Sequence, residues 1–535
     1  MPLTIRQRSQ QVADYIQTHA ASTIATIAEA TGLHPSSVHR HRQGLSRRQQ
    51  YPESSWWETA VGYGWLVRLV IAVVYHFGIK HSVGAESLSA FFKAIHLETQ
   101  VGCSPTALRQ LKHRVEAEVV AYEAAQTDAG PLPEGTGLWV GADETFFGLP
   151  VLVMMELASG FILTEVTASE RTYESWQQHL PPWWDLTRWP CHGAVSDGAK
   201  ALIKLAIADL GGAYMADVFH ALRNVGRPIG QALGRQHAQV TKQRDALEEQ
   251  INQTPPQNPL SPTRQAQWEE LQTQQQRLHA DQQTYHDALQ QVSLTLHPFT
   301  LQHPQWQLAE AMMTQVQAPL QTLTTLATVY GGKTAQSALM TFQQQLPALS
   351  QGIHAWWHWV THELAQQTQD VAVQNWVLMA LLPWLYWSQQ AEKTRRATLK
   401  SRYRQAASDA FDQLIAAPLT LQLCDADLQH WVRWGQWMCT KYQRTSSAIE
   451  GRNGYLTQHH HAARGFSERS LHVLTIVHNF DLKRPDGTTA AQRLFGHPFP
   501  DLFESVLSTF TELPRPRRSS QSPQPNPWQN QLVSA

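Results

Sequence analysis

The sequence predicts an α/β protein whose small mixed-sheet core is interrupted by a large all-helical insertion and preceded by helix-turn-helix units. Short apolar runs typical of strands alternate with helical patterns over residues 136–231. Over residues 232–436 only helical patterns remain. Within the first 128 residues, the same pattern occurs twice: a helix, a turn that contains glycine, and a basic second helix.

Composition indicates a globular protein. Of 535 residues, 42% are hydrophobic and 16% charged, and the length suggests two to four domains. The net charge near −1 counts mildly against a DNA-binding protein, but the basic residues are clustered. The four widely spaced cysteines disfavour a zinc site or a disulfide framework and fit a reducing compartment. We expect the 20 tryptophans to serve mainly as core residues.

The sequence indicates neither a signal peptide nor a comfortable membrane span. The most apolar run, Trp65 to Ile79, contains Arg68 and His76 and is too short to cross a bilayer easily. We expect it to form a buried helix.

Residues 1–50 are predicted to form a helix-turn-helix DNA-binding unit. Ile27 and Ala28 lie on one helical face, and Gly32 in the following turn is free to adopt positive φ. Pro35 then starts a polar, basic helix of the kind that enters DNA grooves. The candidate DNA-contacting residues here are His39, Arg40 and Arg42.

Residues 51–128 are predicted to contain a second unit of this kind. Gly102 lies in its turn, and Pro105 starts its basic helix. The helical stripe before the turn consists of Leu88, Phe91, Phe92 and Ile95. Its candidate DNA-contacting residues are Arg109 and Lys112. Each unit alone could be an ordinary helical hairpin, but two in tandem favour DNA binding.

A linker over residues 126–137 leads to the sheet-forming region, 136–231. The expected strands are 138–143, 151–157, 161–166, 192–196 and 213–218, with helices over 172–179 and 199–210. Three meandering strands followed by alternating helices and strands predict a mixed sheet.

The insertion, 232–436, is expected to open with two glutamine-rich helices, 236–253 and 264–293, joined by a proline-rich turn at 254–262. The second helix carries a heptad seam. Its members are Trp268, Leu271, Gln275, Leu278, Gln282, Tyr285, Leu289 and Val292. Because two are glutamines, the seam is a weak dimerisation signal. Further helices are expected over 305–435.

Two aspartates follow apolar strand patterns and are candidate metal ligands. Asp143 ends one expected strand and Asp197 another. Phosphodiester chemistry can use two cations about 3.5–4 Å apart, one at each end of the displacement. Carboxylates are the ligands that hard cations prefer. An aspartate at a strand end is more often only a turn former, so neither residue is decisive alone.

The surrounding residues resemble the catalytic core of bacterial insertion-sequence DDE transposases. The matching segments are Asp143 with its strand, Val195 to Ala199, Asp217 to Asn224, Thr445 to Asn453, and Arg464-Gly465-Phe466. The resemblance covers about 138–225 and 440–480. It implies an RNase H-like core with a long helical insertion before the third acid, Glu450, in its Ser-Ala-Ile-Glu setting. Asp143 and Asp197 are 54 residues apart, and Glu450 lies 253 residues beyond Asp197.

Two positions depart from the family. Many relatives have asparagine where this chain has Ser447, and some have cysteine where it has Asp217. Neither change removes a proposed metal ligand.

The resemblance and the two-metal chemistry together suggest roles for these residues. Asp143, whose strand is central in this fold, would bridge two Mg²⁺ or Mn²⁺ ions, and Asp197 and Glu450 would each hold one. Glu144 is left out because, if the strand continues past Asp143, Glu144 points to the opposite face. The remaining candidates for DNA contact or for supporting the site are His220, Arg223, Arg452 and Asn453.

The sequence therefore predicts a transposase that binds double-stranded DNA, both transposon ends and target, as a homodimer in the nucleoid-associated cytoplasm, without a membrane partner. Residues 437–512 would complete the catalytic core, and 513–535 would be a disordered tail. Two alternatives remain: a domesticated DNA-binding protein that no longer cuts, and another RNase H-like nuclease.

Overall fold

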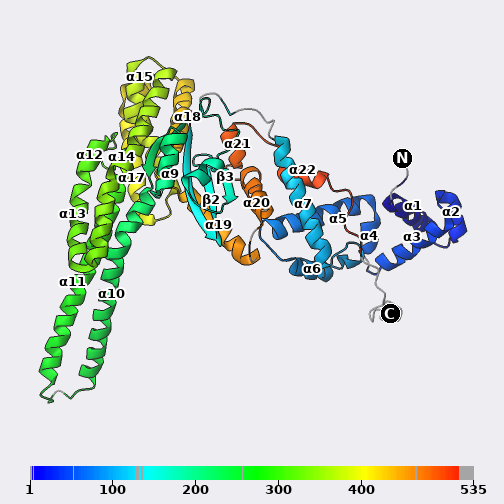
Figure 1. The fold of residues 1–535 in the computed structure, drawn as a ribbon, viewed down its shortest axis with the longest axis horizontal. Coiled ribbons are helices and arrows are strands. Elements are labelled where there is room, and N and C mark those ends of the chain that lie inside the picture. Colours follow the sequence, from blue (N-terminus) through cyan, green and yellow to red (C-terminus); the bar gives the residue numbers. More distant parts are fainter. Residues whose placement is uncertain are drawn as a thin grey trace. The chain divides into compact units, whose positions relative to one another are not determined.

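The computed structural model describes residues 3, 5–51, 53–126, 132–133, 136–255, 257–463, 465 and 467–516 (Figure 1). The chain forms two compact units. Unit 2 is Leu132–Gly454, and unit 1 combines Met1–Pro131 with Tyr455–Ala535. The boundary falls within helix α19 (Ser447–Ala463).

Unit 2 contains one five-stranded mixed sheet. Its strands are β1 (Leu138–Phe147), β2 (Leu149–Glu156), β3 (Phe161–Thr167), β4 (Cys191–Ser196) and β5 (Ala213–Ala216). The order is β3-β2-β1-β4-β5, so β1 is central. β1, β2 and β3 form an antiparallel meander, whereas β4 pairs in parallel with β1 and β5 with β4. The mixed α/β prediction is confirmed, with all five strands close to their expected positions.

Strand β1 is longer than expected. It continues four residues beyond Asp143, which pairs with Val153 in the middle of the β1–β2 ladder. The turn at Gly148, with φ +88°, then closes the hairpin. Asp143 therefore lies within a strand and does not end it, because hairpin pairing carries the polar residues after it.

The remaining core elements of unit 2 are short helices between the strands. These are α8 (Tyr173–Gln178), α9 (Lys200–Lys204) and the single turn η3 (Leu205–Asp209). Asp217, expected within the last strand, instead caps the helix that begins the insertion.

The regular elements of the insertion are all helices in its described residues, as predicted, and a single antiparallel bridge joins Phe299 and Trp306 in the loop after α11. Its first two helices, α10 (Val218–Asn252) and α11 (Ser261–Thr295), have 35 residues each and form the expected antiparallel hairpin (Figure 1). The following elements are α12 (Ala309–Gln315), α13 (Gln317–Leu326), η4 (Ala327–Gly331), α14 (Gly332–Gln367), α15 (Val371–Trp376), η5 (Val377–Leu381), α16 (Leu382–Lys393), α17 (Ala397–Ala416), η6 (Pro418–Leu421) and α18 (Asp425–Lys441).

The heptad seam of α11 packs within the chain. Leu278, Tyr285 and Val292 are buried, and α10 is the neighbouring helix. The Tyr285 hydroxyl donates to the carbonyl of Gly226 on α10 at 3.0 Å. Gln275 accepts a hydrogen bond from Arg244 Nη1 at 2.6 Å, which satisfies a polar seam position. The seam thus holds the hairpin together and is not evidence of dimerisation.

Unit 1 begins with three helices, α1 (Ile5–Thr18), α2 (Ile24–Thr31) and α3 (Pro35–Arg48). Their core comprises Val12, Ala13, Ile27, Ala28, Val38 and Leu45. Gly32 ends α2 with φ +67°, and Pro35 starts α3, as expected. The α2–turn–α3 arrangement confirms the predicted helical geometry, and α1 completes its core.

The remaining regular elements of the described part of unit 1 are also helices, with one antiparallel bridge between Lys483 and Thr489. These elements are α4 (Ser54–Glu58), α5 (Ala60–Val73), η1 (Val74–Ile79), α6 (Ala85–Ala94), η2 (Leu97–Thr99), α7 (Pro105–Gln126), α20 (Glu468–Phe480), α21 (Ala490–Phe495) and α22 (Leu502–Ser508). In the expected stripe on α6, Leu88 and Phe92 are buried, whereas Phe91 and Ile95 are exposed.

Residues 455–512 do not complete the sheet-containing core. The expected second part of that core was 437–512, but α20 and α22 pack against α7 within unit 1. Buried apolar side chains of α20 explain this grouping, because they need a helical partner such as α7 to cover them. Most of the expected tail, and Arg464 and Phe466 of the family resemblance, lie outside the described residues.

One described segment, Ala60–Ile79, is long and apolar enough to cross a membrane by length and composition. One such helix is weak evidence, since core helices pass the same test. Leu66, Val70, Ile71 and Tyr75 are almost fully buried, and α7 and α22 pack against this segment. Val61, Trp65 and Phe77 are exposed, so the prediction of a buried helix is confirmed for one face of this segment only.

Candidate metal centre

The centre is built on one face of β1. Asp143 Oδ2 accepts a hydrogen bond from Asn453 Nδ2 of α19 at 3.0 Å. The next side chain, Glu144, instead accepts from Trp176 Nε1 of α8 at 3.4 Å. Successive side chains of a strand point to opposite faces. The two acids therefore have different surroundings.

A glycine lets α19 come close to β1. A Cβ atom at Gly141 would lie 2.8 Å from side-chain atoms of both Ile449 and Leu157. Gly141 lies two residues before Asp143, on the same strand face. The absent side chain makes room for Ile449, which directly precedes Glu450 and is fully buried.

A buried ion pair fixes α19 over the sheet. Arg452 donates from Nε to Glu165 Oε1 at 2.8 Å and from Nη2 to Oε2 at 2.6 Å. Their side chains are 1% and 0% exposed. Glu165 pairs with Val153, and Val153 pairs with Asp143, so these residues form one row across β3, β2 and β1. The same helix therefore contacts both ends of this row, through Arg452 and Asn453.

A second tie joins the starts of α10 and α19. Asp217 is buried, and its Oδ1 accepts from the backbone N–H of His220 at 2.9 Å. Its Oδ2 accepts from Ser446 N at 2.6 Å and from Ser446 Oγ at 2.5 Å. One carboxylate thus places His220 of α10 beside the first turn of α19, which carries Glu450.

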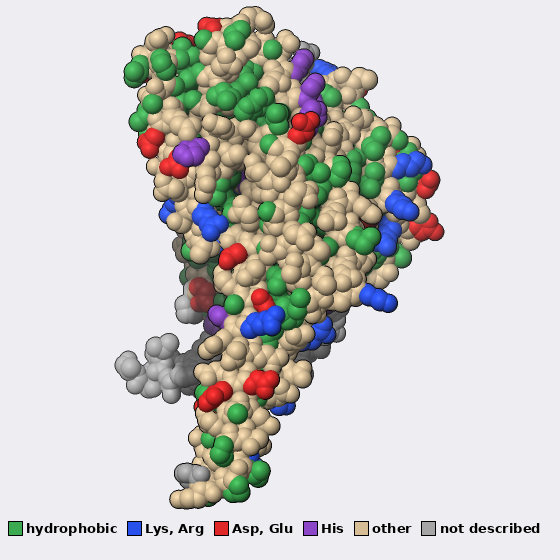
Figure 2. All heavy atoms as spheres, turned by 90° about the vertical axis from the view of Figure 1, so that its left-hand side faces the viewer, with side chains coloured by type: hydrophobic (Ala, Val, Ile, Leu, Met, Phe, Trp, Pro, Cys, Tyr) green, Lys and Arg blue, Asp and Glu red, His purple; other side chains and the backbone are tan. Residues whose placement is uncertain are grey.

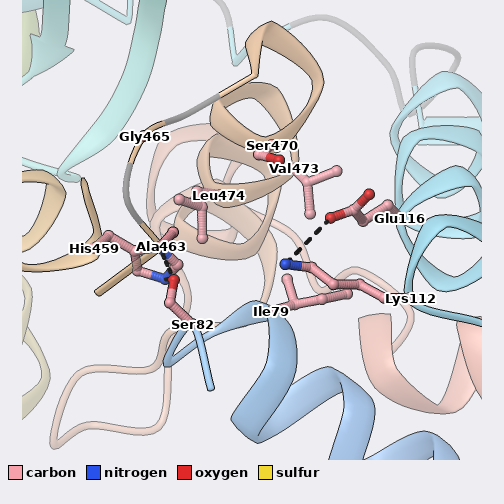
Figure 3. Close-up of a pocket in the computed structure, with 10 residues that line it drawn as sticks. All are labelled: Ile79, Ser82, Lys112, Glu116, His459, Ala463, Gly465, Ser470, Val473 and Leu474. Atoms are coloured by element: carbon pink, nitrogen blue, oxygen red, sulfur yellow. Dashed lines mark hydrogen bonds and ion pairs between the residues drawn. The ribbon is translucent and has the colours of Figure 1, made fainter. Parts of the chain in front are cut away.

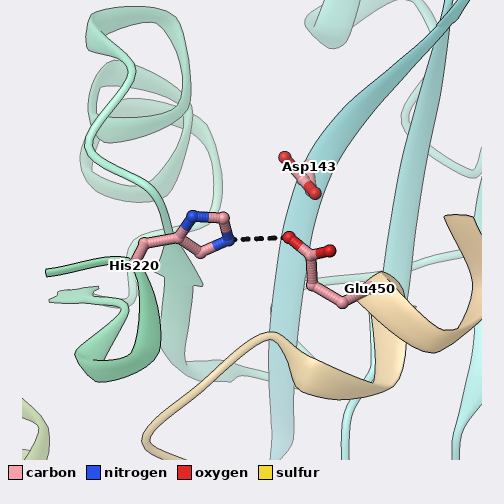
Figure 4. Close-up of side chains that lie close together, drawn as sticks. All are labelled: Asp143, His220 and Glu450. Atoms are coloured by element: carbon pink, nitrogen blue, oxygen red, sulfur yellow. Dashed lines mark ion pairs between the residues drawn. The ribbon is translucent and has the colours of Figure 1, made fainter. Parts of the chain in front are cut away.

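These constraints bring Asp143, His220 and Glu450 together (Figure 4). One ligand atom from each residue lies within 4.8 Å of the others. His220 Nε2 is 2.9 Å from Glu450 Oε1. Two carboxylates and one imidazole can ligate a divalent cation such as Mn²⁺, and carboxylates alone suit Mg²⁺.

Electrostatics disfavour the ionised form of the Asp143 carboxyl group. Burial, together with the nearby Glu450 carboxylate, raises the pKa of Asp143 to about 7. A bound cation would reverse this effect, because it stabilises the ionised carboxylate. A buried acid beside a second acid is the kind of arrangement that functional sites adopt.

Asp197 lies beside this cluster but is not part of it. Val195 of β4 pairs with Gly141 of β1, so Asp197 is at the level of Asp143 on the adjacent parallel strand. It follows β4 and is exposed, and its Oδ1 accepts from Ala199 N at 3.0 Å. Its charge also contributes to the raised pKa of Asp143. The structure therefore brings two of the three expected acids together and places the third nearby.

The candidate DNA-contacting residues fall into two groups. His39, Arg40 and Arg42 on α3, and Arg223 on α10, are exposed. Asn453 and His220 face the acids, and Arg452 is buried against Glu165. A buried arginine paired with Glu165 has no surface to offer a phosphate, so this position does not fit the expected DNA contact by Arg452.

The two basic residues of the second expected DNA-binding unit are paired with acids. Arg109 forms an ion pair with Glu86. Lys112 Nζ lies 3.8 Å from Glu116 Oε1, in a small pocket that Ser82 and His459 also line (Figure 3). These acids reduce the positive charge that a groove-binding helix would present. The geometry of this unit gives DNA binding less support than that of α3.

Sequence reasoning missed three supporting residues, Gly141, Glu165 and Asp217. An acid inside the apolar run of β3 was a usable signal for Glu165, since a buried carboxylate requires a partner. Asp217 was noticed only as a departure from the family. Nothing local to Gly141 distinguishes it from any other glycine in a strand.

Residues 377–522 match a family described as a family of unknown function (DUF6399). The match covers about a quarter of the chain and includes Glu450, but neither Asp143 nor Asp197. No curated protein and no solved structure matches the chain.

Proposed function

We propose that this chain is a DDE transposase that binds transposon ends and catalyses metal-dependent cleavage and transfer of DNA strands. The observation that carries the proposal is the cluster of Asp143, His220 and Glu450. Glu450 follows Asp143 by 307 residues, and a helical insertion separates them. Acids this distant in sequence meet only if other contacts hold their elements together. The close approach at Gly141, the Arg452–Glu165 ion pair and the Asp217–Ser446 hydrogen bonds are such contacts.

An RNase H-like core is part of the same proposal. In its support, the sheet has an antiparallel meander followed by two parallel strands, and the first acid lies on the central strand. The long helical block between Asp197 and Glu450 also agrees with the transposase subgroup that the sequence resembles.

In this proposal Asp143 and Glu450 would hold one divalent cation, and Asp143 and Asp197 would hold another. Mg²⁺ or Mn²⁺ held there would supply activation of a water or 3′-hydroxyl and charge stabilisation of the leaving oxygen. Asn453 holds one oxygen of Asp143, and His220 positions Glu450. The exposed basic residues of α3 supply phosphate contacts for binding the ends.

Strand cleavage tests the proposal. The full-length chain is incubated with Mg²⁺ or Mn²⁺ and the DNA that borders its own gene on each side, and the nicks are mapped. We expect cuts at terminal inverted repeats. Asp143→Asn, Asp197→Asn and Glu450→Gln should each abolish cleavage while DNA binding persists.

Glu144→Gln is the matched control, because Glu144 lies on the same strand but faces α8. It should retain cleavage. If the unaltered chain binds DNA but cleaves it with neither Mg²⁺ nor Mn²⁺, the proposal is refuted. That result would favour the non-cutting DNA-binding alternative. Full activity of Glu450→Gln would remove Glu450 from the centre.

A further inference from the structure

A basic cluster lies at the start of α17, outside the candidate metal centre. We define the α17 basic cluster as Arg395, Arg396, Lys400, Arg402 and Arg404. Its arginines are exposed and Lys400 is partly exposed. The first turn of α17 contains no acidic residue, so the positive end of the helix dipole adds to the same field. The chain as a whole has a net charge near −1, so this field is local.

Among the residues that the structure describes, the α17 basic cluster lacks acidic partners, whereas several other arginines of the chain have them. Elsewhere Arg68, Arg109 and Arg244 each lie within 4 Å of an acidic side chain. Within the described part of the chain, no residue of the α17 basic cluster forms an ion pair. These cations lie at the surface without an internal counter-charge, so an external polyanion would supply one.

The cluster is mounted on a rigid base. Tyr403, in the middle of it, is 3% exposed and its ring stacks on Trp387 at 5.2 Å. The Tyr403 hydroxyl also lies 3.3 Å from Nε2 of the buried His297. Because α17 is anchored there, its cations need little ordering when they bind a ligand.

We infer that the α17 basic cluster binds the sugar–phosphate backbone of duplex DNA, as a contact surface on the insertion separate from α3. The inference rests on the proposed function, which supplies DNA as the partner. Four of the five residues are arginines, whose planar guanidinium groups match phosphate oxygens in pairs. Figure 2 shows a face made up mainly of backbone and uncharged side chains, with the Lys and Arg side chains mostly toward one edge. Such a surface would hold DNA by charge and would not read its sequence.

The test measures binding of the full-length chain to a fluorescein-labelled 40-base-pair duplex of random sequence, in EDTA, between 0.05 and 0.3 M salt. One variant changes all five residues of the cluster to glutamine. Each lost phosphate contact lowers the slope of log affinity against log salt by about 0.9, so the slope should fall by about 4. Affinity at 0.1 M salt should fall at least tenfold.

The control removes five positive charges elsewhere in the insertion, by changing Arg235, Lys242, Arg264, Arg277 and Lys333 to glutamine. It should change affinity less than twofold. A second variant converts the four arginines of the cluster to lysine. It should keep most of the salt slope, because lysine retains the positive charge at each position.

The inference is overturned if the cluster variant and the glutamine control lose affinity for the duplex equally. It is also overturned if the cluster variant loses no affinity. Binding to phosphatidylserine vesicles without binding to the duplex would also overturn it. If the unaltered chain cleaves DNA but the cluster variant binds normally, only this inference fails. If the cluster variant loses binding but the unaltered chain never cleaves, only the proposed activity fails.

Discussion

Asp143→Asn should stabilise the chain when divalent cations are absent. Burial and the Glu450 carboxylate raise the pKa of Asp143 to about 7. In an unfolded chain the same carboxyl group titrates near about 3.9. The raised pKa means that the folded protein favours the protonated acid. The protonated Asp143 side chain contributes its full stabilisation below about pH 4, and this stabilisation is lost as the pH rises to about 7.

The size of the effect follows from that difference. Each pKa unit corresponds to about 1.4 kcal/mol, so about three units set a ceiling of about 4 kcal/mol above pH 7. The side chain is only partly buried, and we expect about 2 kcal/mol. Asparagine cannot ionise, and its side-chain oxygen can still accept the hydrogen bond from Asn453.

The assay is urea unfolding of the full-length protein in EDTA at pH 5 and pH 8. The stability gain of Asp143→Asn over the unaltered chain should be larger at pH 8. Adding Mg²⁺ should stabilise the unaltered chain at pH 8 and leave the variant unchanged, because a ligand of the native state stabilises by mass action. A gain of the same size at both pH values, or Mg²⁺ stabilisation of both proteins, would refute the reasoning.

Three further substitutions test how α19 is held. Gly141→Ala overpacks the contact with α19, so the free energy of unfolding should fall by about 1–3 kcal/mol and the cleavage rate at least tenfold. Gly451→Ala is the control, because a Cβ there meets open space, and its thermal unfolding should be unchanged. In Asp217→Asn the side-chain oxygen can still cap α10, but the new amide group faces the Ser446 N–H, and both are donors. Urea unfolding should therefore show a fall of about 2–3 kcal/mol in the free energy of unfolding. Glu165→Gln leaves its buried arginine partner uncompensated, so the same measurement should show a loss of about 3–5 kcal/mol. An unchanged unfolding midpoint in either of the last two variants would contradict the role assigned to that contact.

Local sequence patterns predicted most elements of the fold. Apolar runs located all five strands, and the proline-rich turn located the hairpin of α10 and α11. The end of β1 was misplaced because Glu144 and Thr145 resemble a loop, whereas their pairing with β2 is a tertiary effect. The grouping of α20 with α7 was missed for the same reason, because no local pattern shows which partner covers a helix.

The site was predictable only in part. The setting of Glu450 identified it by resemblance, but its meeting with Asp143 depends on Gly141 and Asp217, whose roles exist only in the folded chain. Arg452 illustrates the limit most clearly. Beside a candidate catalytic acid it suggests a phosphate contact, and only the packing of α19 over β3 shows that it is buried against Glu165.

Direct titration of cation binding tests the central claim, that Asp143 and Glu450 share a divalent cation. Mn²⁺ bound to the full-length chain can be counted by electron paramagnetic resonance without DNA or turnover. We predict saturable binding by the unaltered chain and by Glu144→Gln, and its loss in Asp143→Asn and in Glu450→Gln. Unchanged Mn²⁺ binding in those two variants would contradict the account.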